Sequence, residues 1–480
     1  MVKKSILLFL FFLAPPIWGQ ATFPGAEGAG AATAAGRGGT IIRVTNLNNS
    51  GAGSLRNCLE GTGTRICVCD VGGTVVTTSQ ININSGNLSF YGQTCPGGGL
   101  TVNGSGHSDQ VILVNAPNVL IQYLTVRAGF NAGRSPSVCC SNFWLSGNTN
   151  NAILDHVSMS WAADENLTIW RASGLPGQFN LTFSWSILSE GFGTAIAIGC
   201  AAGTACADVQ DDFDFHHNLM GWTSHRHPNG GGDTGRWVNN ITYNWSFRAM
   251  QWEGGTDIDI INNVWKLGPM GNPSREINIW PAGLDVEASG DPSFYVVGNK
   301  GPNNSDPNAD NWPTMIREFD TFNGPEIGQL STQYRRFNPL AAQTYPITAI
   351  ATNSVESQVL ELVGNSRRLG CDGVWVMRRD AVDTRLINEY NAGTGISAVI
   401  TNESQVGGFP TISGGTACTD TDGDGMFDLY ETNNGLNPNN AADANTVAAN
   451  GYRNIENFMQ GQTPPPEQGQ PQGGPTGKLP

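Results

Sequence analysis

Long apolar runs are scarce in this chain of 480 residues. The run from Ile6 to Leu13 follows Lys3 and Lys4 and precedes prolines and small residues. It is far shorter than the roughly 20 residues that cross a bilayer, and no later segment is longer and equally apolar. We interpret residues 1–21 as a secretory signal peptide and expect a secreted, extracellular protein with no membrane partner.

Basic residues are also scarce. The chain has 25 Lys and Arg against 40 Asp and Glu, which gives a net charge of -15. This balance excludes nucleic acid as a partner and favours cation binding. Only 14% of the residues are charged, whereas 62 are glycine, a composition typical of one long, turn-rich all-β domain rather than of three domains.

Zinc-type CxxC pairs are absent among the 10 cysteines, and export favours disulfides instead. Cys139 and Cys140 are adjacent, and a bridge between neighbours is strained, so we expect each to be buried or paired elsewhere. The spacing suggests these pairs: Cys200 with Cys206, Cys58 with Cys67 or Cys69, and Cys371 with Cys418.

A loose repeat runs through the chain from about residue 118. Short β-branched or aromatic segments, such as NVLIQYLTV, NLTFSWSIL and DFDFHHNLM, begin at intervals of about 22 to 36 residues. Asparagine recurs near one place in the unit, and stacked asparagines could satisfy backbone groups at a corner. These asparagines are Asn218, Asn240, Asn263 and Asn299. The intervals are too long for the hairpins of an antiparallel sandwich, so we predict an all-β parallel β-helix.

The periodicity fades beyond residue 300. RRDAVDTRLINEYNAGTG predicts a short amphipathic helix with Val382, Leu386 and Ile387 on one side and Gly393 near its end. This helix should pack on the solenoid. The Pro-, Gly- and Gln-rich residues 461–480 predict a disordered tail.

DTDGDGMFDLYE, from Asp420 to Glu431, has the spacing of a calcium loop, in which hard oxygens surround the ion and Gly425 permits the sharp turn. The alternative is a solvated acidic turn. The loop and the following GLNPNNAADAN and GYRNIENF resemble thrombospondin type-3-like and dockerin-like calcium modules. The predicted ligands are Asp420, Asp422, Asp424, Asp428 and Glu431.

Several long motifs resemble polysaccharide lyase family 1, the pectate lyases. They include FPGAEGAGAATAAGRGGTIIRVTNLNNSGAGSLRNCLE, DHVSMSWAADENLTIW, DFDFHHNLMGWTSHRHP and RRDAVDTRL, and they extend over most of the chain after residue 21. The resemblance implies a right-handed parallel β-helix that cleaves polygalacturonate, an acidic plant or algal cell-wall polysaccharide, by calcium-assisted β-elimination.

The resemblance assigns the catalytic base to an arginine ahead of a proline, which here is Arg226, two residues before Pro228. Arginine is normally always protonated, because its reference pKa exceeds 12. His225 and His227 are better tuned for proton transfer at neutral pH. Adjacent residues on an extended segment point to opposite sides, so we expect both histidines to face away from Arg226. Alternatively, Arg226 pairs with a substrate carboxylate.

The calcium ligands implied by the resemblance are only partly present. The position of the usual acidic ligand, thirteen residues before Asp155, holds Asn142. Asp164 and Glu165 are the remaining acidic candidates for this ion. The second basic position of the family holds Asn229, which leaves Arg236 as the nearest basic candidate for substrate binding.

Glu190 is a second candidate substrate contact, and otherwise a surface acid. We expect His216 and His217 to be structural and the tryptophans to pack within the coils.

We therefore expect a β-helix lyase domain at 22–410, a calcium module at 411–460 and a monomeric protein. Two alternatives stay open within this fold: a noncatalytic β-helix that binds anionic glycans, and a lyase for a different uronate polymer. A hydrolase would need clustered aspartates, and VQDDFDF is the only such cluster; its alternation suggests solvent-facing positions.

Overall fold

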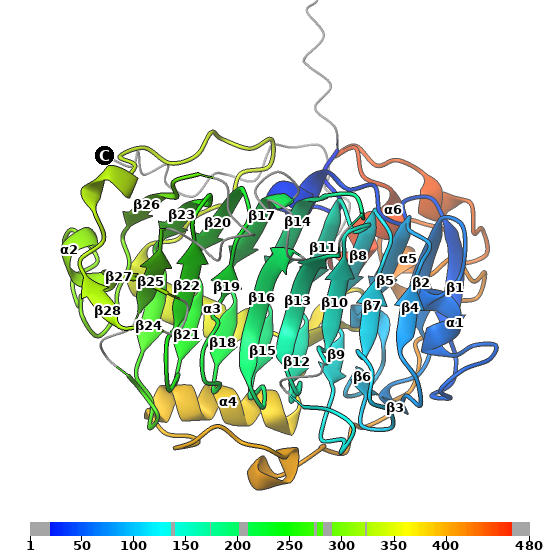
Figure 1. The fold of residues 1–480 in the computed structure, drawn as a ribbon. Helices are drawn as coiled ribbons and strands as arrows, with labels where there is room; N and C mark the ends of the chain where they lie inside the picture. The colour runs from blue at the N-terminus through cyan, green and yellow to red at the C-terminus, as the bar shows by residue number, and fades with distance from the viewer. Residues whose placement is uncertain are drawn as a thin grey trace, which may run out of the picture.

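The computed structural model describes residues 20–135, 140–172, 174–200, 210–272, 276–281, 290–321 and 324–462. Over these residues the chain forms a right-handed parallel β-helix whose coils stack along one axis (Figure 1). Each complete coil contributes one strand to each of three sheets, as the predicted solenoid requires. The predicted signal peptide and disordered tail lie almost wholly outside the described residues.

Sheet 1 has ten strands, all paired in parallel. In spatial order they are β1 (Thr40–Val44), β2 (Arg65–Cys69), β5 (Leu88–Tyr91), β8 (Val119–Gln122), β11 (Ala152–Asp155), β14 (Gln178–Ser184), β17 (Gln210–His216), β20 (Thr234–Val238), β23 (Asp257–Ile261) and β26 (Ser293–Val297).

Sheet 2 has eight shorter strands. They are β3 (Gly73–Val76), β6 (Leu100–Asn103), β9 (Thr125–Arg127), β12 (Ser158–Ser160), β15 (Ile187–Ser189), β18 (Leu219–Gly221), β21 (Ile241–Tyr243) and β24 (Val264–Lys266).

Sheet 3 has ten strands, of which only the last pair, β27 and β28, is antiparallel. They are β4 (Ile81–Ile83), β7 (Ile112–Val114), β10 (Phe143–Ser146), β13 (Glu165–Arg171), β16 (Thr194–Cys200), β19 (Asn229–Gly230), β22 (Met250–Glu253), β25 (Ile277–Trp280), β27 (Ile316–Phe319) and β28 (Glu326–Gly328). A separate antiparallel pair consists of β29 (Arg367–Leu369) and β30 (Trp375–Met377).

Each predicted strand unit contains a sharp corner. In DFDFHHNLM, strand β17 ends at His216 and β18 begins at Leu219, with His217 at a φ of 58° between them. Left-handed backbone of this kind is uncommon outside glycine, and it redirects the chain from sheet 1 to sheet 2. The corner thus divides the unit into two strands, one in sheet 1 and one in sheet 2.

An asparagine ladder lines the corner between sheets 1 and 2. Asn263 donates from Nδ2 to Trp237 O at 2.8 Å and to Asn299 Oδ1 at 3.0 Å. Its own Oδ1 accepts from the backbone N of Asn240 at 2.8 Å. The same pattern connects the predicted asparagines through Asn311, so the predicted ladder is confirmed. Fully buried amide groups are satisfied in this way from coil to coil.

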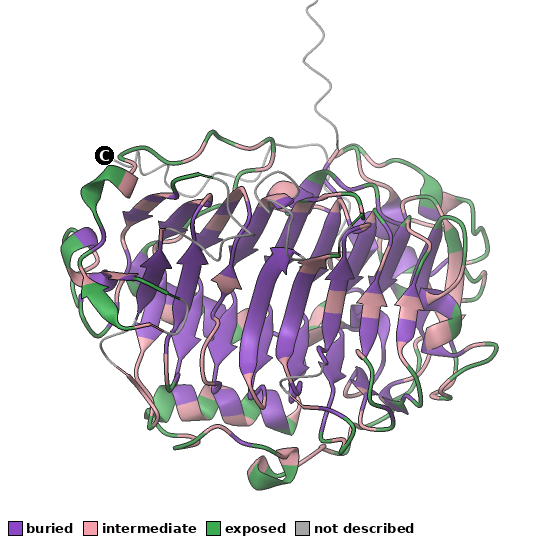
Figure 2. Ribbon diagram, viewed as in Figure 1, coloured by how far each residue is buried: buried purple, intermediate pink, exposed green. Residues whose placement is uncertain are grey.

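The interior of the coils is apolar. Phe183, Phe215 and Trp237 lie at equivalent places in successive coils, with ring centroids 4.5 Å apart at each step. Figure 2 shows the strands mostly buried and the exposed residues gathered on loops and helices. Trp245 is fully buried inside the coils, as expected, whereas Trp161 and Trp222 are buried on the outer face of sheet 2, so the expectation is wrong for these two.

Helices and short turns cover the outside of the β-helix. The α-helices are α1 (Leu55–Leu59), α2 (Trp312–Met315), α3 (Thr352–Leu362), α4 (Ala381–Ala392), α5 (Asp428–Asn433) and α6 (Asn454–Met459). The 3-10 turns are η1 (Ala29–Ala32), η2 (Gly92–Thr94), η3 (Thr332–Tyr334), η4 (Glu403–Val406) and η5 (Asp443–Asn445).

Helix α4 is the predicted amphipathic helix. Asp380 caps its N-terminus by accepting from the backbone N–H groups of Val382 and Asp383, and Gly393 ends it at a φ of 67°. Leu386 and Tyr390 pack with Val355 and Val359 of α3 against the outer face of sheet 2. The prediction that this helix packs on the solenoid is therefore confirmed.

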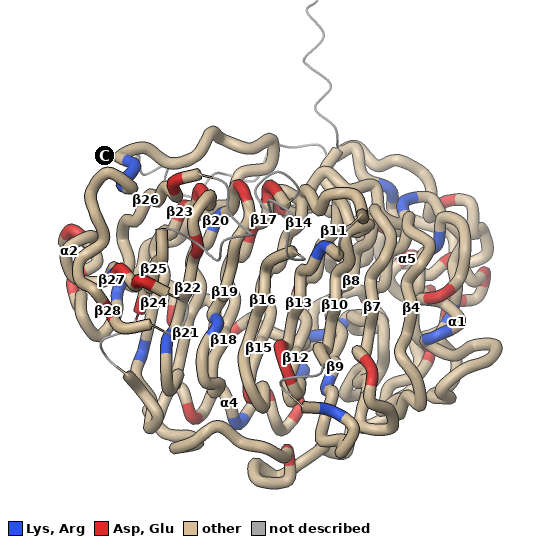
Figure 3. Tube along the Cα trace, viewed as in Figure 1, with Lys and Arg blue, Asp and Glu red and all other residues tan. Residues whose placement is uncertain are grey.

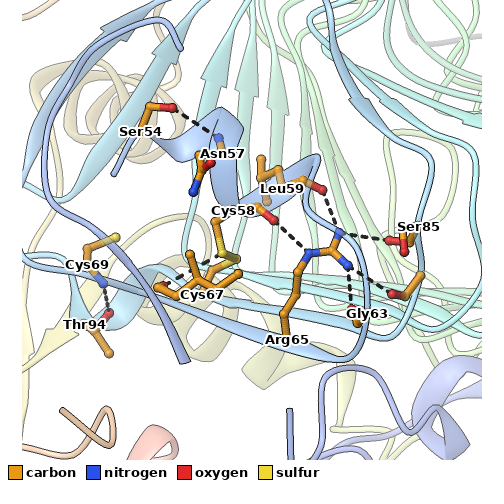
Figure 4. The surroundings of a disulfide bond; sticks show 12 residues. Ser54, Asn57, Cys58, Leu59, Gly63, Arg65, Cys67, Cys69, Ser85 and Thr94 are labelled. Atoms are coloured by element: carbon orange, nitrogen blue, oxygen red, sulfur yellow. Dashed lines mark hydrogen bonds between the residues drawn. A yellow bond between two sulfur atoms is a disulfide. The ribbon is translucent and has the colours of Figure 1, made fainter. Parts of the chain in front are cut away.

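Three disulfides are described in full: Cys58–Cys67, Cys69–Cys95 and Cys371–Cys418. The first fastens α1 to β2 beside Arg65, whose guanidinium donates to the carbonyls of Cys58 and Leu59 (Figure 4). Of the predicted pairs, Cys58–Cys67 and Cys371–Cys418 are confirmed. Cys69–Cys95 was not among the pairs predicted from the spacing. Cys139 and Cys206 lie outside the described residues.

No helix among the described residues is both long enough and apolar enough to span a bilayer.

The ladder yields a stability prediction. Replacing Asn263 by alanine leaves the Asn240 N–H and the Trp237 carbonyl without their buried partners, so we expect the free energy of unfolding to fall by about 3 kcal/mol. Chemical denaturation measures the change. The control is Asn388→Ala on the exposed face of α4, which should change stability little. Equal losses in the two variants would contradict a structural role for the ladder.

Candidate active site

Arg226 lies at the corner between sheets 2 and 3, in the segment that joins β18 to β19. The backbone N–H groups of Ala195 and Ile196 in β16 donate to the carbonyls of His225 and Arg226, at 3.2 and 2.9 Å. The next N–H, that of His227, donates to Ala249 O at 2.8 Å. This segment is therefore held between its two neighbouring coils by the hydrogen bonds of the β-helix.

The Arg226 backbone has a φ of 68°. This conformation is uncommon for a residue with a side chain and is found disproportionately at functional sites. The guanidinium is a quarter exposed and forms an ion pair with the Glu165 carboxylate at the start of β13. The expectation of an extended segment is wrong here. Arg226 instead occupies a left-handed turn that faces a carboxylate of the coil two turns earlier.

Glu165 and Asp164 form an acidic pair beside Arg226. Glu165 is almost fully buried and also accepts from Thr168 Oγ1 at 3.4 Å. Asp164 is half-buried. Burial, followed by repulsion from Glu165, raises the pKa of Asp164 well above its usual range. Two crowded carboxylates next to one guanidinium favour the binding of a further cation.

The two neighbouring histidines are both weakly basic. His227 is fully buried and shares a hydrogen bond of 2.7 Å with Thr223 Oγ1. Burial lowers its pKa to about 3. Burial and the nearby Arg226 charge lower the pKa of His225 to about 3 as well. Such weakly basic imidazoles are poor proton acceptors, which leaves Arg226 as the candidate base of the segment.

A hollow of about 210 Å³, called the groove below, is lined in part by Ala163, the residue that precedes Asp164. Figure 3 shows few charged residues along the middle of the sheet 3 strands, so the charges of this region gather at the corners. The hollow is lined by Gly129, Phe130, Asn131, Arg134, Ser135, Ala163, Phe192 and Thr401. Phe130 in this lining is nearly half exposed and offers an apolar surface.

Known proteins resemble this chain over nearly its whole length. Probable pectate lyase C of Aspergillus oryzae is 31% identical over 446 residues, which are 92% of this chain and 94% of the relative. Probable pectate lyase C of Neosartorya fischeri is 30% identical over 472 residues, or 96% of this chain and 99% of the relative. The chain belongs to the pectate lyase family. No protein-family model matches it.

Solved structures also resemble this member of the pectate lyase family. A mutant of Bacillus subtilis pectate lyase aligns with a TM-score of 0.49 and 14% identity over 73% of this chain and 99% of that one. The cedar pollen allergen jun a 1 aligns with a TM-score of 0.44 and 14% identity over 71% of this chain and 92% of that one.

Asn142 does not face the groove in this pectate lyase family member. The side chain is 0% exposed, and its Nδ2 donates to Ser160 O at 3.0 Å and to Asn166 Oδ1 at 2.9 Å. Both hydrogens of the amide are thus used inside the wall of the coil. The amide thus belongs to a second, shorter asparagine ladder, while its Oδ1, the atom that could bind calcium, is buried and has no hydrogen-bond partner, so Asn142 stays a predicted ligand.

Arg236 and Glu190 do not join Arg226 either, and the two substrate-binding predictions need correction. Arg236 lies in sheet 1, where it donates to Ala341 O at 2.8 Å and approaches Asp214 Oδ1 at 3.5 Å. Glu190 is fully buried. Its carboxylate accepts two hydrogen bonds of 2.8 Å from the Arg385 guanidinium of α4 and one of 3.0 Å from Trp161 Nε1. Glu190 is therefore neither a surface acid nor open to substrate.

The histidines expected to be structural form part of a stack. His216 and His217 are buried, with their Nδ1 atoms 3.0 Å apart. His217 stacks on Trp185 at 4.4 Å between centroids, and the stack continues through His156 to Tyr123. Burial lowers the pKa of His217 to about 2, so this ring is a neutral packing element.

A second acidic cluster lies in the predicted C-terminal calcium loop. Carboxylate oxygens of Asp420, Asp422 and Asp424 lie within 4.8 Å of one another, and so do those of Asp424, Glu431 and Asp443. Burial, then repulsion from neighbouring carboxylates, raises the pKa of Glu431 to about 8.

Asp428, the remaining predicted ligand of this loop, has a different role. Its carboxylate accepts from Thr421 N and Thr421 Oγ1, both at 2.7 Å, and it is not among the clustered acids. Asp443 belongs to the cluster but lies outside the twelve-residue motif, so the sequence pattern could not identify it.

The placement of Asn142 predicts the effect of Asn142→Asp. If Asn142 were a weakened ligand, an aspartate should raise calcium affinity or activity. We expect instead a loss of stability of about 2 kcal/mol, since the carboxylate cannot donate to Ser160 O and Asn166 Oδ1 and is buried. Thermal unfolding and calcium titration of the variant distinguish the two, with Asn388→Asp on exposed α4 as the control.

Proposed function

We propose that the protein is a secreted family 1 polysaccharide lyase that cleaves polygalacturonate by β-elimination and releases unsaturated oligouronides. The observation that carries the proposal is the group formed by Arg226, Glu165 and Asp164 at the corner between sheets 2 and 3. The curated relatives bear the name pectate lyase, which supports the same reaction.

Asp164 and Glu165 are the residues that would hold a calcium ion in this groove. Their oxygens are the hard donors that calcium prefers, and burial, then repulsion from Glu165, raises the pKa of Asp164. Two carboxylates leave coordination positions for oxygens of the substrate. When bound, calcium would neutralise the charge of the uronate carboxylate and so make the adjacent C5 proton more acidic.

Arg226 acts as the base in this proposal. Its neutral guanidine accepts the C5 proton, the electron pair of the C5–H bond forms the C4–C5 double bond, and the bond between C4 and the glycosidic oxygen breaks. The leaving oxygen takes up a proton from solvent.

The turn at Arg226 positions the base. Three successive backbone hydrogen bonds fix the segment on both sides, and the Glu165 carboxylate orients the guanidinium. Fixed geometry of this kind lowers the entropic cost of bringing the base to C5. The exposed ring of Phe130 offers a nearby surface on which a sugar ring could pack.

Replacing Arg226 tests the proposal. With polygalacturonate and calcium at alkaline pH, Arg226→Ala should lower kcat by about 10² to 10⁴-fold, the usual contribution of a positioned base. The ultraviolet absorbance of the unsaturated product measures the rate. Arg226→Lys should retain part of the activity, and the matched control Arg236→Ala in sheet 1 should keep it.

The alternatives give different outcomes in the same assay. If folded wild type binds polygalacturonate but forms no absorbing product at any pH, the protein is a noncatalytic glycan-binding β-helix. If another uronate polymer gives the absorbing product and polygalacturonate gives none, that polymer is the substrate. Equal rates for Arg226→Ala and wild type would contradict the assignment of the base.

The acidic pair yields a separate prediction. Asp164→Asn removes one of the two charges available to the ion, so the calcium concentration for half-maximal activity should rise by on the order of tenfold. The control is Asp211→Asn in sheet 1, a similar carboxylate outside the groove. An unchanged calcium requirement for Asp164→Asn would exclude Asp164 as a ligand.

A further inference from the structure

The C-terminal segment from Thr419 to Gln462 packs on the outer face of sheet 1 at its first coils, as Figure 1 shows for α5 and α6 beside β1, β2 and β5. Met426, Phe427 and Phe458 share a buried cluster with Ile66 and Val68 of β2. The segment thus covers apolar side chains of the β-helix itself. It packs as part of the same body rather than as a separate module.

Polar contacts reinforce this packing at the same place. Arg43 of β1 forms ion pairs with Asp70 and with Asp420, the first residue of the acidic loop. Arg37 contacts Glu456 of α6 at 2.5 Å, and Gln93 Nε2 donates to Met459 O at 3.0 Å. The loop is therefore connected directly to the edge strand of sheet 1 through Arg43.

The clustered carboxylates of this loop lack partners where burial would require them. Glu431 is 0% exposed, and neither of its carboxylate oxygens has a hydrogen-bond partner. Asp424 is 3% exposed, and its Oδ2 has none either. A buried carboxylate without a partner is costly, so a group of them directed at one point is the arrangement of a cation site.

The backbone of the loop is shaped around the same point. Asp420 accepts from the N–H groups of Gly423 and Gly425, at 2.8 and 2.9 Å, which curls the loop toward its own first residue. Gly425 has a φ of 93°, and a side-chain carbon there would approach Ile455 to 3.2 Å. A glycine is required at this turn by both the conformation and the close packing on α6.

We propose that a calcium ion bound by Asp420, Asp422, Asp424, Glu431 and Asp443 connects the C-terminal segment to the first coils of the β-helix. Asp443 contributes from η5, beyond the twelve-residue motif, so the ion joins two stretches of the segment. Asp428 is left out of the ligand set because it is not among the clustered carboxylates, and both of its oxygens accept from Thr421. The preference for calcium follows from the number of hard oxygen donors, which exceeds what the smaller magnesium ion accepts from protein.

The role of this ion is structural and separate from the proposed lyase site. Without it, repulsion among five carboxylates opposes the fold of the loop, and the apolar cover over Ile66 and Val68 loosens. With it, the segment holds the exposed end of sheet 1, where the unpaired edge of β1 would otherwise invite association with other chains. Calcium should therefore stabilise the whole protein, including variants that lack the groove acids.

The test uses the full chain carrying Asp164→Asn and Glu165→Gln, so that calcium binding in the groove does not contribute. Calorimetric titration with calcium chloride should give one site, and calcium should raise the melting temperature relative to a chelator by several degrees. Magnesium chloride at equal concentration should do so far less. Absence of calcium binding by this folded variant would overturn the proposal, whatever the fate of the lyase assignment.

Two further variants in the same background test the ligand set. Asp443→Asn should weaken calcium binding by at least about tenfold, and Asp428→Asn by less than about twofold. A site confined to the twelve-residue motif gives the opposite order, which would overturn the role of Asp443. The substitutions are isosteric, and circular dichroism without calcium checks that both variants fold.

Discussion

The corners of the coil are the constraint on which the structure depends. A parallel β-helix has no hairpins, so the register of each coil on the next must be fixed where the chain turns. Here a left-handed residue redirects the chain, and a buried asparagine next to it bonds the equivalent asparagine one coil further on. Each amide thereby satisfies backbone groups that the corner removes from the sheet ladder. Register errors would leave these groups unpaired in the interior, so the ladder excludes them.

The candidate site inherits its geometry from this register. Glu165 pairs with Thr194 in the next coil, and Thr194 forms a bridge with His225 in the coil after that. Arg226 therefore reaches Glu165 across one intervening coil, although the two residues are far apart in sequence. A slip by one residue at any corner between them would exchange inward and outward side chains and separate the pair. The arrangement of the candidate site is thus a property of the stack rather than of the SHRHP segment alone.

Sequence reasoning succeeded where a feature repeats and failed where it depends on a corner. The strand-rich units, the asparagines and helix α4 leave periodic patterns that can be read directly. The corner within each unit does not, because His217 and Arg226 adopt positive φ values that their residue types disfavour. The same uncertainty affected Asn142, Glu190 and Arg236. The sequence shows the type of each residue, but the direction of its side chain depends on how neighbouring coils pack.

Burial and partners together separate the roles of the acidic residues. Glu190 is fully buried but receives Arg385 and Trp161, so its charge is neutralised inside the fold. Glu165 is also buried, yet its partner Arg226 is a quarter exposed. The Arg226 guanidinium could therefore exchange Glu165 for another ligand. Glu431 is buried and has no hydrogen-bond partner at either oxygen. The three carboxylates thus form a series: Glu190 in a structural ion pair, Glu165 in a contact with a partly exposed partner, and Glu431 buried without a hydrogen-bond partner. The motif around each residue shows only that an acid is present, whereas the tertiary contacts determine which of these it can be.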